Sequence, residues 1–85
     1  MSIREFLLDE YLDIVLLDDF DDAIIGIAEK YGEDYVVAYD KQKIIDILID
    51  ECDLSEEEAV EHCEFNIMGG YYGDRTPVFI SVNEY

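Results

Sequence analysis

The chain has 85 residues, which leaves room for one domain built around one hydrophobic core. Hydrophobic residues make up 51% of it and include seven Tyr and four Phe, so it differs from a disordered acidic tail and is expected to fold. Its 23 acidic and five basic residues give a formal net charge of -18, which argues against direct binding to nucleic acid or to an anionic membrane.

The chain shows no segment that predicts export or membrane insertion. No stretch reaches the roughly 18 uninterrupted apolar residues of a membrane-spanning helix, and the N-terminus lacks the segments of a signal peptide. We therefore expect a cytoplasmic protein. In a reducing compartment Cys52 and Cys63 are expected to be buried free thiols.

The first predicted element is an amphipathic helix from Ser2 to about Leu17. Ser2 is a suitable N-cap, and apolar residues recur at helical spacing with acids between them. Leu8, Leu12 and Leu16 add a second apolar row, so the apolar face is wider than a surface helix needs. This row predicts either a central helix or a homodimer contact.

A second helix is predicted from about Phe20 to Tyr31, ended by Gly32. Gly26 inside it suggests close approach of a neighbouring element. Acids suit the positive end of the helix dipole at its start, and four of them gather there. They are Asp18, Asp19, Asp21 and Asp22.

The next predicted elements are a buried strand and a third helix. Residues Tyr35–Tyr39 are β-branched and aromatic and are bounded by turn residues, which predicts the strand. Asp40 can cap a helix from Lys41 to about Cys52, where a run of isoleucines supplies a broad apolar face.

The C-terminal third predicts a fourth helix, a loop and a second strand. Ser55 and Glu58 form the pattern of a capping box, which starts a helix running to about Ile67. Its expected core-facing positions are Ala59, Val60, Cys63 and Ile67. Residues 68–77 hold three glycines and the only proline, as expected of a structured loop, and Val78–Val82 reads as a strand.

These elements predict an α+β fold, formed by residues 1–85 as a single acidic globular domain. Four short helices cover a small two-stranded sheet in the order ααβααβ. Two strands alone make a marginal sheet, so the helices must cover them.

Short motifs spread from Asp22 to Phe79 resemble those of a known protein family. The motifs are Asp22-Ala23, Gly26, Ala28-Glu29, Tyr31-Gly32, Val37-Ala38-Tyr39-Asp40, Glu57-Glu58-Ala59, Glu64-Phe65-Asn66, Gly69, Gly73 and Thr76-Pro77-Val78-Phe79. Over about two thirds of its length the chain resembles a family of small uncharacterised acidic proteins of tailed bacteriophages and prophages. The resemblance implies a phage protein in the cytoplasm of a bacterial host. Acidic phage proteins of this size are often inhibitors of host defence, including DNA mimics of the anti-CRISPR or anti-restriction type.

No catalytic, metal or cofactor site is predicted. Cys52, His62 and Cys63 have irregular spacing for zinc, and Cys63 and His62 point to different sides of one helix. The glycines of residues 69–73 follow a helix and have no lysine after them, unlike a phosphate-binding loop. The acids after Asp18 do not have the spacing of a calcium-binding loop. We therefore expect a protein that is not an enzyme.

The acids themselves are the candidate site. Five cations cannot pair 23 acids, and the remaining self-repulsion is destabilising. If the acids gathered on one half of the surface, each would occupy about 110 Å², close to the roughly 100 Å² per phosphate of B-DNA. A simpler alternative is a solvated surface that keeps the protein soluble. The predicted partner-binding acids are Asp9, Asp13, Asp18, Asp19, Asp21, Asp22, Glu56, Glu57, Glu58, Glu61 and Glu64.

Two functional hypotheses follow. In the first, the chain mimics nucleic acid and blocks the nucleic-acid-binding groove of a basic host defence protein. In the second, it is a phage structural or assembly accessory protein that dimerises through the first helix and binds a protein through an apolar face. Tyr71 and Tyr72 are added to the predicted contact residues, since tyrosine is enriched at binding hot spots, although their loop could simply be a turn.

Overall fold

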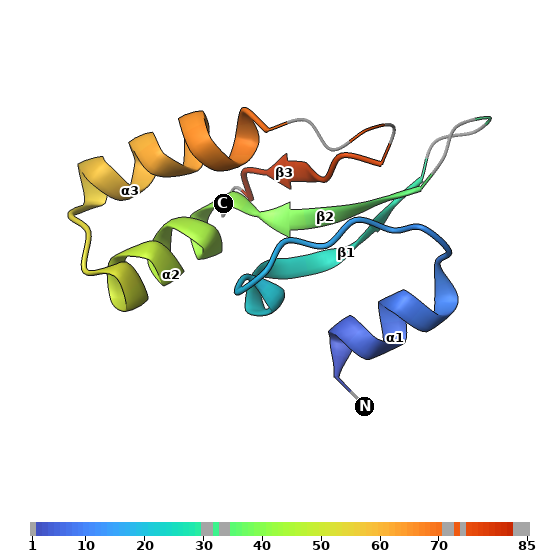
Figure 1. Cartoon of the computed structure of the whole chain (residues 1–85). Helices are drawn as coiled ribbons and strands as arrows, with labels where there is room; N and C mark the ends of the chain where they lie inside the picture. Colours follow the sequence, from blue (N-terminus) through green and yellow to red (C-terminus); the bar gives the residue numbers. More distant parts are fainter. Residues whose placement is uncertain (1, 30–31, 33–34, 71–72, 74, 83–85) are drawn as a thin grey trace.

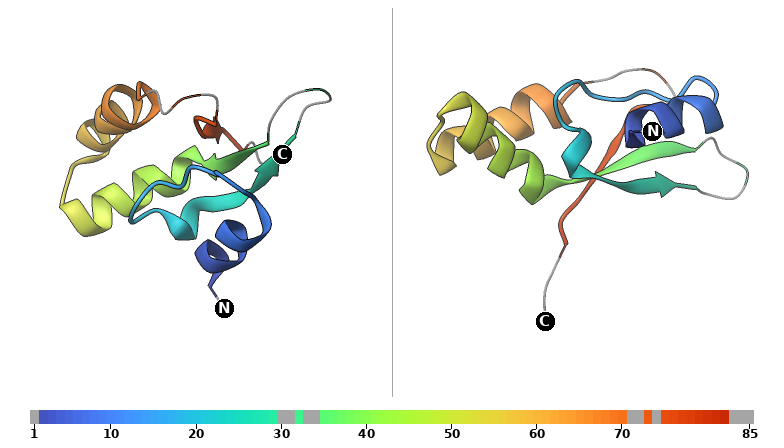
Figure 2. Two further views of the ribbon diagram at one scale, coloured as in Figure 1. Left: turned by 45° about the vertical axis from the view of Figure 1, so that its right-hand side comes forward. Right: turned by 90° about the horizontal axis from the view of Figure 1, so that it is seen from below.

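A three-stranded mixed sheet lies at the centre of the fold. The computed structural model describes residues 2–29, 32, 35–70, 73 and 75–82. In chain order its elements are α1 (Ile3–Glu10), the 3-10 turn η1 (Asp21–Ala23), β1 (Ile24–Ala28), β2 (Val36–Asp40), α2 (Lys41–Cys52), α3 (Glu56–His62), the π-helical turn η2 (Cys63–Met68) and β3 (Val78–Ile80). Figures 1 and 2 show α2 and α3 together at one end of the sheet and α1 at the other.

The strand order is β1-β2-β3, with β1 antiparallel and β3 parallel to β2. Two parallel neighbours need a long crossover connection, and α2, α3 and η2 supply it here. Ile44, Ile45 and Leu48 on the inner side of α2 are buried, and Ala59 is buried on α3. The helix pair is therefore fastened to the sheet through one continuous core.

The predicted fold, four helices over a two-stranded sheet in the order ααβααβ, is wrong. The described residues form three helices and a three-stranded sheet in the order helix, strand, strand, helix, helix, strand. The difference arises in the helix predicted from Phe20 to Tyr31, where residues 21–28 form η1 and then β1 instead. Ile24, Ile25 and Ile27 are β-branched and favour a strand, and Gly26 weakens a helix. Pairing with β2 decides between the two.

The first helix is also shorter than predicted. It was expected over Ser2–Leu17, and although Ser2 caps it, α1 ends at Glu10. Asp13 and Asp19 adopt left-handed backbone angles, with φ of 62° and 71°. Aspartate tolerates this conformation better than most residues, and a residue with these backbone angles interrupts a right-handed helix. Residues 11–20 therefore run as an irregular segment.

This segment is fastened to the sheet by Tyr39. Ile14 and Leu17 are buried, and the Leu17 N–H donates to the Tyr39 hydroxyl oxygen at 2.8 Å. The Tyr39 side chain is 0% exposed and its ring is stacked with that of Phe79, at a centroid distance of 6.0 Å. Burial raises the pKa of Tyr39, an effect that the hydrogen bond from Leu17 partly offsets. Tyr39 thus joins β2, β3 and the N-terminal segment.

The remaining predicted elements agree with the structure. The strand expected at Tyr35–Tyr39 is confirmed as β2 with a small shift, and the helix expected at Lys41–Cys52 has those bounds. Asp40 caps that helix by accepting two backbone hydrogen bonds from its first turn. The last strand is confirmed but shorter, with Val78–Ile80 in place of Val78–Val82.

The states of the two cysteines and the lengths of the helices bear on the predicted cytoplasmic location. Cys63 is a buried free thiol, as predicted, and burial raises its pKa. Cys52 is free but exposed, so its predicted burial is wrong: it is the last residue of α2 and lies away from the inner side of that helix. No helix in the described part of the chain is long and apolar enough to span a membrane.

The hydrogen bond to Tyr39 predicts a measurable loss of stability. Tyr39→Phe is expected to lower the free energy of unfolding by about 1–3 kcal/mol, because the buried Leu17 N–H loses its acceptor. Tyr35→Phe is the matched control, since the Tyr35 hydroxyl donates to the Leu12 carbonyl at an exposed position where water can replace it. Its expected loss is below about 0.5 kcal/mol. Urea denaturation followed by circular dichroism measures both, and equal losses would contradict this role of Tyr39.

Candidate functional site

The predicted partner-binding acids fall into two groups that do not share one ridge. One group lies in or near α1 and η1, and the other lies on α3 and at the start of η2, which continues it. Figures 1 and 2 show α1 and α3 at opposite corners of the molecule. The first group is Asp9, Asp13, Asp18, Asp19, Asp21 and Asp22, and the second is Glu56, Glu57, Glu58, Glu61 and Glu64.

Several acids of the N-terminal group have structural roles. The Arg4 guanidinium donates to both carboxylate oxygens of Asp21, from Nε at 3.1 and 3.0 Å, and from Nη2 to the Leu17 carbonyl at 2.7 Å. The hydrogen bond with Asp21 raises the pKa of Arg4. Asp13 and Asp19 occupy the left-handed turns. Because Asp21 is paired with Arg4 and Asp13 and Asp19 form turns, these acids are weaker candidates for a dedicated binding surface.

The α3 group begins at a helix cap that the sequence predicted. The Ser55 hydroxyl accepts from the Glu58 N–H at 3.2 Å, and the Ser55 N–H donates to the Glu58 carboxylate at 3.1 Å. These hydrogen bonds lower the pKa of Glu58 and confirm the capping box. The Glu58 carboxylate therefore serves the cap, while Glu56, Glu57, Glu61 and Glu64 extend along the rest of the helix.

The π-helical turn η2 determines which side chains face outward. Ala59, Cys63 and Ile67 are buried and recur every four residues, whereas an ideal α-helix has 3.6 residues per turn. The wider turn of η2 keeps Cys63 and Ile67 on the same inner face. Glu64 and Phe65, which lie between them, are consequently both exposed.

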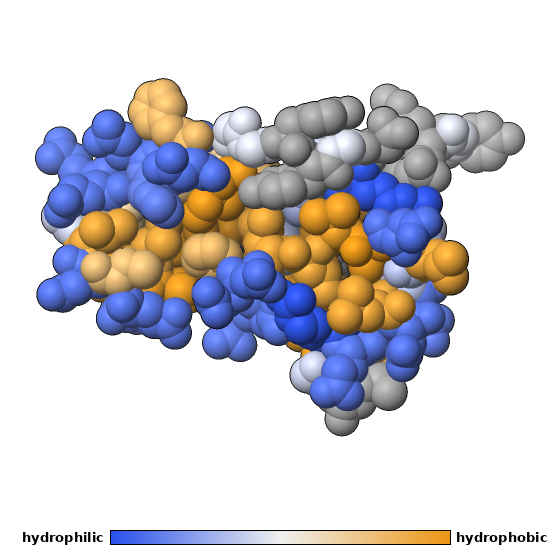
Figure 3. Space-filling model, viewed as in Figure 1, coloured by the Kyte–Doolittle hydropathy of each residue, from blue (hydrophilic) through white to orange (hydrophobic). Residues whose placement is uncertain are grey.

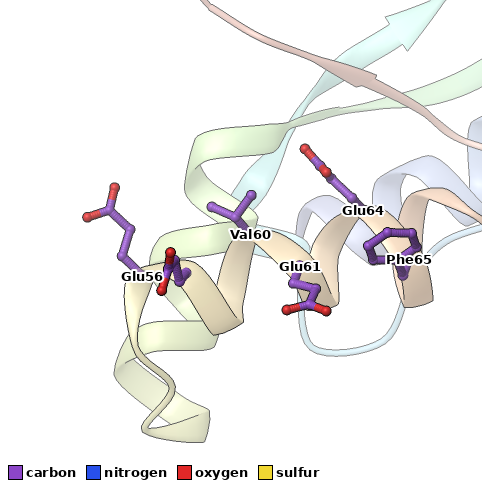
Figure 4. A pocket seen from close by; sticks show the side chains of 6 residues that line it. Glu56, Val60, Glu61, Glu64 and Phe65 are labelled. Atoms are coloured by element: carbon purple, nitrogen blue, oxygen red, sulfur yellow. The ribbon is translucent and has the colours of Figure 1, made fainter.

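These outward side chains line a shallow groove with a volume of about 370 Å³. Figure 4 shows them projecting from α3 between Glu56 at one end and Phe65 at the other. Half-buried Val60 gives the groove an apolar part, and Phe65 is 74% exposed. We call it the α3 groove, and its lining residues are Glu56, Glu57, Val60, Glu61, Glu64 and Phe65.

A second depression of about 380 Å³ lies beside the α3 groove. It shares Glu61 and Phe65 with the groove and adds Leu54, Glu58, His62 and Asn66. The Asn66 amide nitrogen lies 3.2 Å from His62 Nδ1. Phe65 therefore stands between two hollows, each of which has carboxylates in its lining.

The acids of the α3 groove have little internal compensation. Lys41 Nζ lies 3.0 Å from the Glu64 carboxylate. Within the described residues no ion pair reaches Glu56, Glu57 or Glu61. The neighbouring helix α2 and its end add further exposed acids to this end of the molecule. They are Asp46, Asp50, Glu51 and Asp53.

Figure 3 shows exposed hydrophobic surface at this end of the molecule. Hydrophobic side chains are exposed in a band across the face in view, and hydrophilic side chains border the band over α2 and α3. Acids at the rim of exposed apolar surface are typical of a protein contact site. The α2–α3 end thus offers both charge and apolar area.

The sequence prediction missed Val60 and Phe65 as groove residues. Val60 was assigned to the core, and Phe65 was noted only within a family motif. The usable signal was the four-residue spacing of Ala59, Cys63 and Ile67, which leaves Phe65 off the inner face. The other predicted contact residues, Tyr71 and Tyr72, lie outside the described residues.

The like charges on α3 predict that one substitution stabilises the protein. Glu61 is one turn from both Glu57 and Glu64, so Glu61→Gln is expected to raise the free energy of unfolding by about 0.2–0.5 kcal/mol at low salt. The gain should vanish in 1 M NaCl, where charges are screened. Glu64→Gln is the control and should give no gain, since it also removes the contact with Lys41. Urea denaturation at both salt concentrations measures this, and a loss of stability for Glu61→Gln would refute the repulsion.

Comparisons of the chain with protein-family models, curated proteins and solved structures found no match. The resemblance to small proteins of tailed bacteriophages and prophages therefore stays a prediction. In the described part of the chain, no group of three or more His, Cys, Asp or Glu side chains is arranged to hold a metal ion. The geometry of α3 is the basis on which a function can be argued.

Proposed function

We propose that this protein binds a basic protein through the α3 groove, with the carboxylates of α3 taking the place of a nucleic-acid backbone. The observation that supports this is the row of Glu56, Glu57, Glu61 and Glu64 along one helix, in which the described residues provide an ion pair to Glu64 alone. The natural complement of such a row is a surface rich in lysine and arginine.

The spacing of the acids fits this role. Residues three and four apart on a helix have Cβ atoms about 5–6 Å apart, so Glu57, Glu61 and Glu64 form a regular line of charge. This spacing is comparable to that of phosphates along one DNA strand, which a cationic groove recognises mainly by charge. Mutual repulsion in the free protein is relieved when cations of a partner lie between the acids, which favours the complex.

In its full form the proposal is an acidic inhibitor of phage type. It would occupy the nucleic-acid-binding groove of a host defence protein, of the CRISPR or restriction class, and exclude DNA or RNA by competition. Figures 1 and 2 show α1, which carries Asp9, far from α3, so the acids of α1 do not continue the line of acids on α3. The mimicking surface is therefore the α3 groove together with the exposed acids of α2.

The experiment compares two variants of equal charge. The groove variant changes Glu56, Glu57, Glu61 and Glu64 to Gln, and the control changes Glu5, Asp9, Glu10 and Glu29, which are exposed and lie outside α2 and α3, to Asn or Gln. Each shifts the formal net charge from -18 to -14. Affinity capture from bacterial lysate at 50 mM and 500 mM NaCl, with elution by duplex DNA or by RNA, measures binding. We expect the wild type and the control to capture a partner that salt weakens and that one of the two nucleic acids elutes. The groove variant should fail to capture it.

Two outcomes would contradict the proposal. If the groove variant and the charge-matched control lose binding equally, net charge rather than the α3 groove is responsible. If neither duplex DNA nor RNA displaces the captured protein, the contact does not lie in a nucleic-acid-binding groove. Circular dichroism of both variants confirms that the fold is retained.

A second candidate function, self-association through α1 as part of an assembly, is favoured by a different observation. On α1, Leu8 is 52% exposed and Ile3 and Phe6 are also exposed, and Leu12, two residues beyond the end of the helix, is 74% exposed. Exposed apolar clusters of this kind mark protein contacts. Salt has opposite effects on the two functions: two chains of charge -18 repel one another, so salt strengthens self-association but weakens binding of a cationic partner.

Sedimentation tests this second function. If α1 joins two copies, the wild type sediments at twice the 9.9 kDa monomer mass, and the Leu8→Asp, Leu12→Asp variant sediments as a monomer. The dimer should become more stable between 50 mM and 500 mM NaCl. A wild-type monomer at both salt concentrations and at 100 µM protein would exclude self-association as the function.

A further inference from the structure

Phe65 is the side chain of the α3 groove that charge mimicry does not explain. It is 74% exposed, while Ala59, Cys63 and Ile67 already form the inner face of the helix. An aromatic ring in this position contributes little to the core. Phe65 is better suited to contact with another protein, because aromatic residues are enriched in the buried centre of protein interfaces.

The surroundings of Phe65 identify the chemistry of its partner. The ring lines both hollows of α3, and Glu61 lines both with it. Glu64 is adjacent in sequence and also lines the α3 groove. An apolar ring face bordered by carboxylates complements a cation, since the cation gains from the ring quadrupole and from the negative charges together.

Arginine fits this arrangement better than lysine. Its guanidinium is planar, stacks on aromatic rings and pairs with a carboxylate through two hydrogen bonds, whereas the lysine ammonium is a compact, strongly hydrated charge. Lys41 already contacts Glu64, so Glu61 is the acid beside Phe65 that no ion pair reaches within the described residues.

The protein itself contains both halves of such a contact. The guanidinium carbon of Arg75 lies 4.3 Å from the centroid of the Tyr35 ring, and Arg4 pairs with the carboxylate of Asp21 through Nε and Nη2. The α3 groove offers a ring and a carboxylate side by side on its exposed surface.

We infer that the α3 groove selects arginine: a partner's guanidinium packs on the ring of Phe65 and pairs with Glu61, while its aliphatic stem contacts Val60. The inference rests on the proposed function, because it specifies which basic side chain the groove receives. It also goes beyond simple mimicry of a polyanion, for which lysine and arginine would be nearly equivalent. The partner surface is then arginine-rich rather than merely basic.

The test uses two short peptides of equal charge, acetyl-triarginine amide and acetyl-trilysine amide. Their affinities are measured by following the Val60 methyl signals in NMR titrations at 50 mM NaCl. For the wild type we expect triarginine to bind on the order of three- to tenfold more tightly than trilysine. Phe65→Leu keeps an apolar side chain and should abolish this preference. Phe6→Leu, at the half-exposed aromatic residue of α1, is the matched control and should retain it.

Equal affinities of the two peptides for the wild type, or a preference that survives in Phe65→Leu, would overturn the inference. Because Phe65 is mostly exposed, the variant is expected to fold, and its melting curve verifies this. The result is separable from the proposed function. If the variant with Glu56, Glu57, Glu61 and Glu64 changed to Gln loses both peptides while Phe65→Leu binds like the wild type, the acidic groove stands and arginine selection falls.

Discussion

The contact between Tyr39 and the N-terminal segment is the constraint on which the architecture depends. Residues 11–20 have no regular structure of their own, yet they place Ile14 and Leu17 in the core because the Leu17 N–H is bound to the Tyr39 hydroxyl. The same ring is stacked with that of Phe79 on β3. One side chain thus links the N-terminal segment, the central strand and the last strand. Arg4 and Asp21 hold α1 against this arrangement.

The core leaves the outer face of α3 exposed. The sheet and the N-terminal segment form the core together with the inner faces of α2 and α3, and the carboxylates of α3 lie outside it. A chain with a net charge of -18 must tolerate strong repulsion, and on α3 the repulsion is concentrated along one line of glutamates. The complete capping box and the buried side chains of Ala59, Cys63 and Ile67 stabilise the helix against this repulsion. The buried inner face stabilises this helix, and the exposed outer face carries its carboxylates.

The sequence predicted best those elements whose signals are local. The Asp40 cap and the isoleucine run of α2, and the Ser55–Glu58 capping box of α3, require no knowledge of distant residues, and the structure confirms them. The error at residues 20–31 has the opposite origin. Ile24 and Ile27 suit a helix and a strand almost equally well, so the outcome depends on pairing with β2, which local spacing does not reveal. The prediction that Leu12 continues the apolar row of the first helix is wrong for a similar reason. The left-handed backbone of Asp13 does not allow the helical path that the spacing of the leucines implied.

In the candidate site, too, some features follow from the local sequence and others from contacts between distant residues. The amino-acid sequence by itself determined that acids outnumber cations several-fold and that Glu57, Glu61 and Glu64 line one side of a helix, since charge and helical spacing are properties of neighbouring residues. Only the tertiary structure decided that the acids near α1 and those on α3 lie apart, that Asp21 is used by Arg4, and that Phe65 stands exposed among carboxylates. The physical reason is that the path of the chain through the sheet, and the wider turn of η2, follow from the packing of distant residues into one shared core.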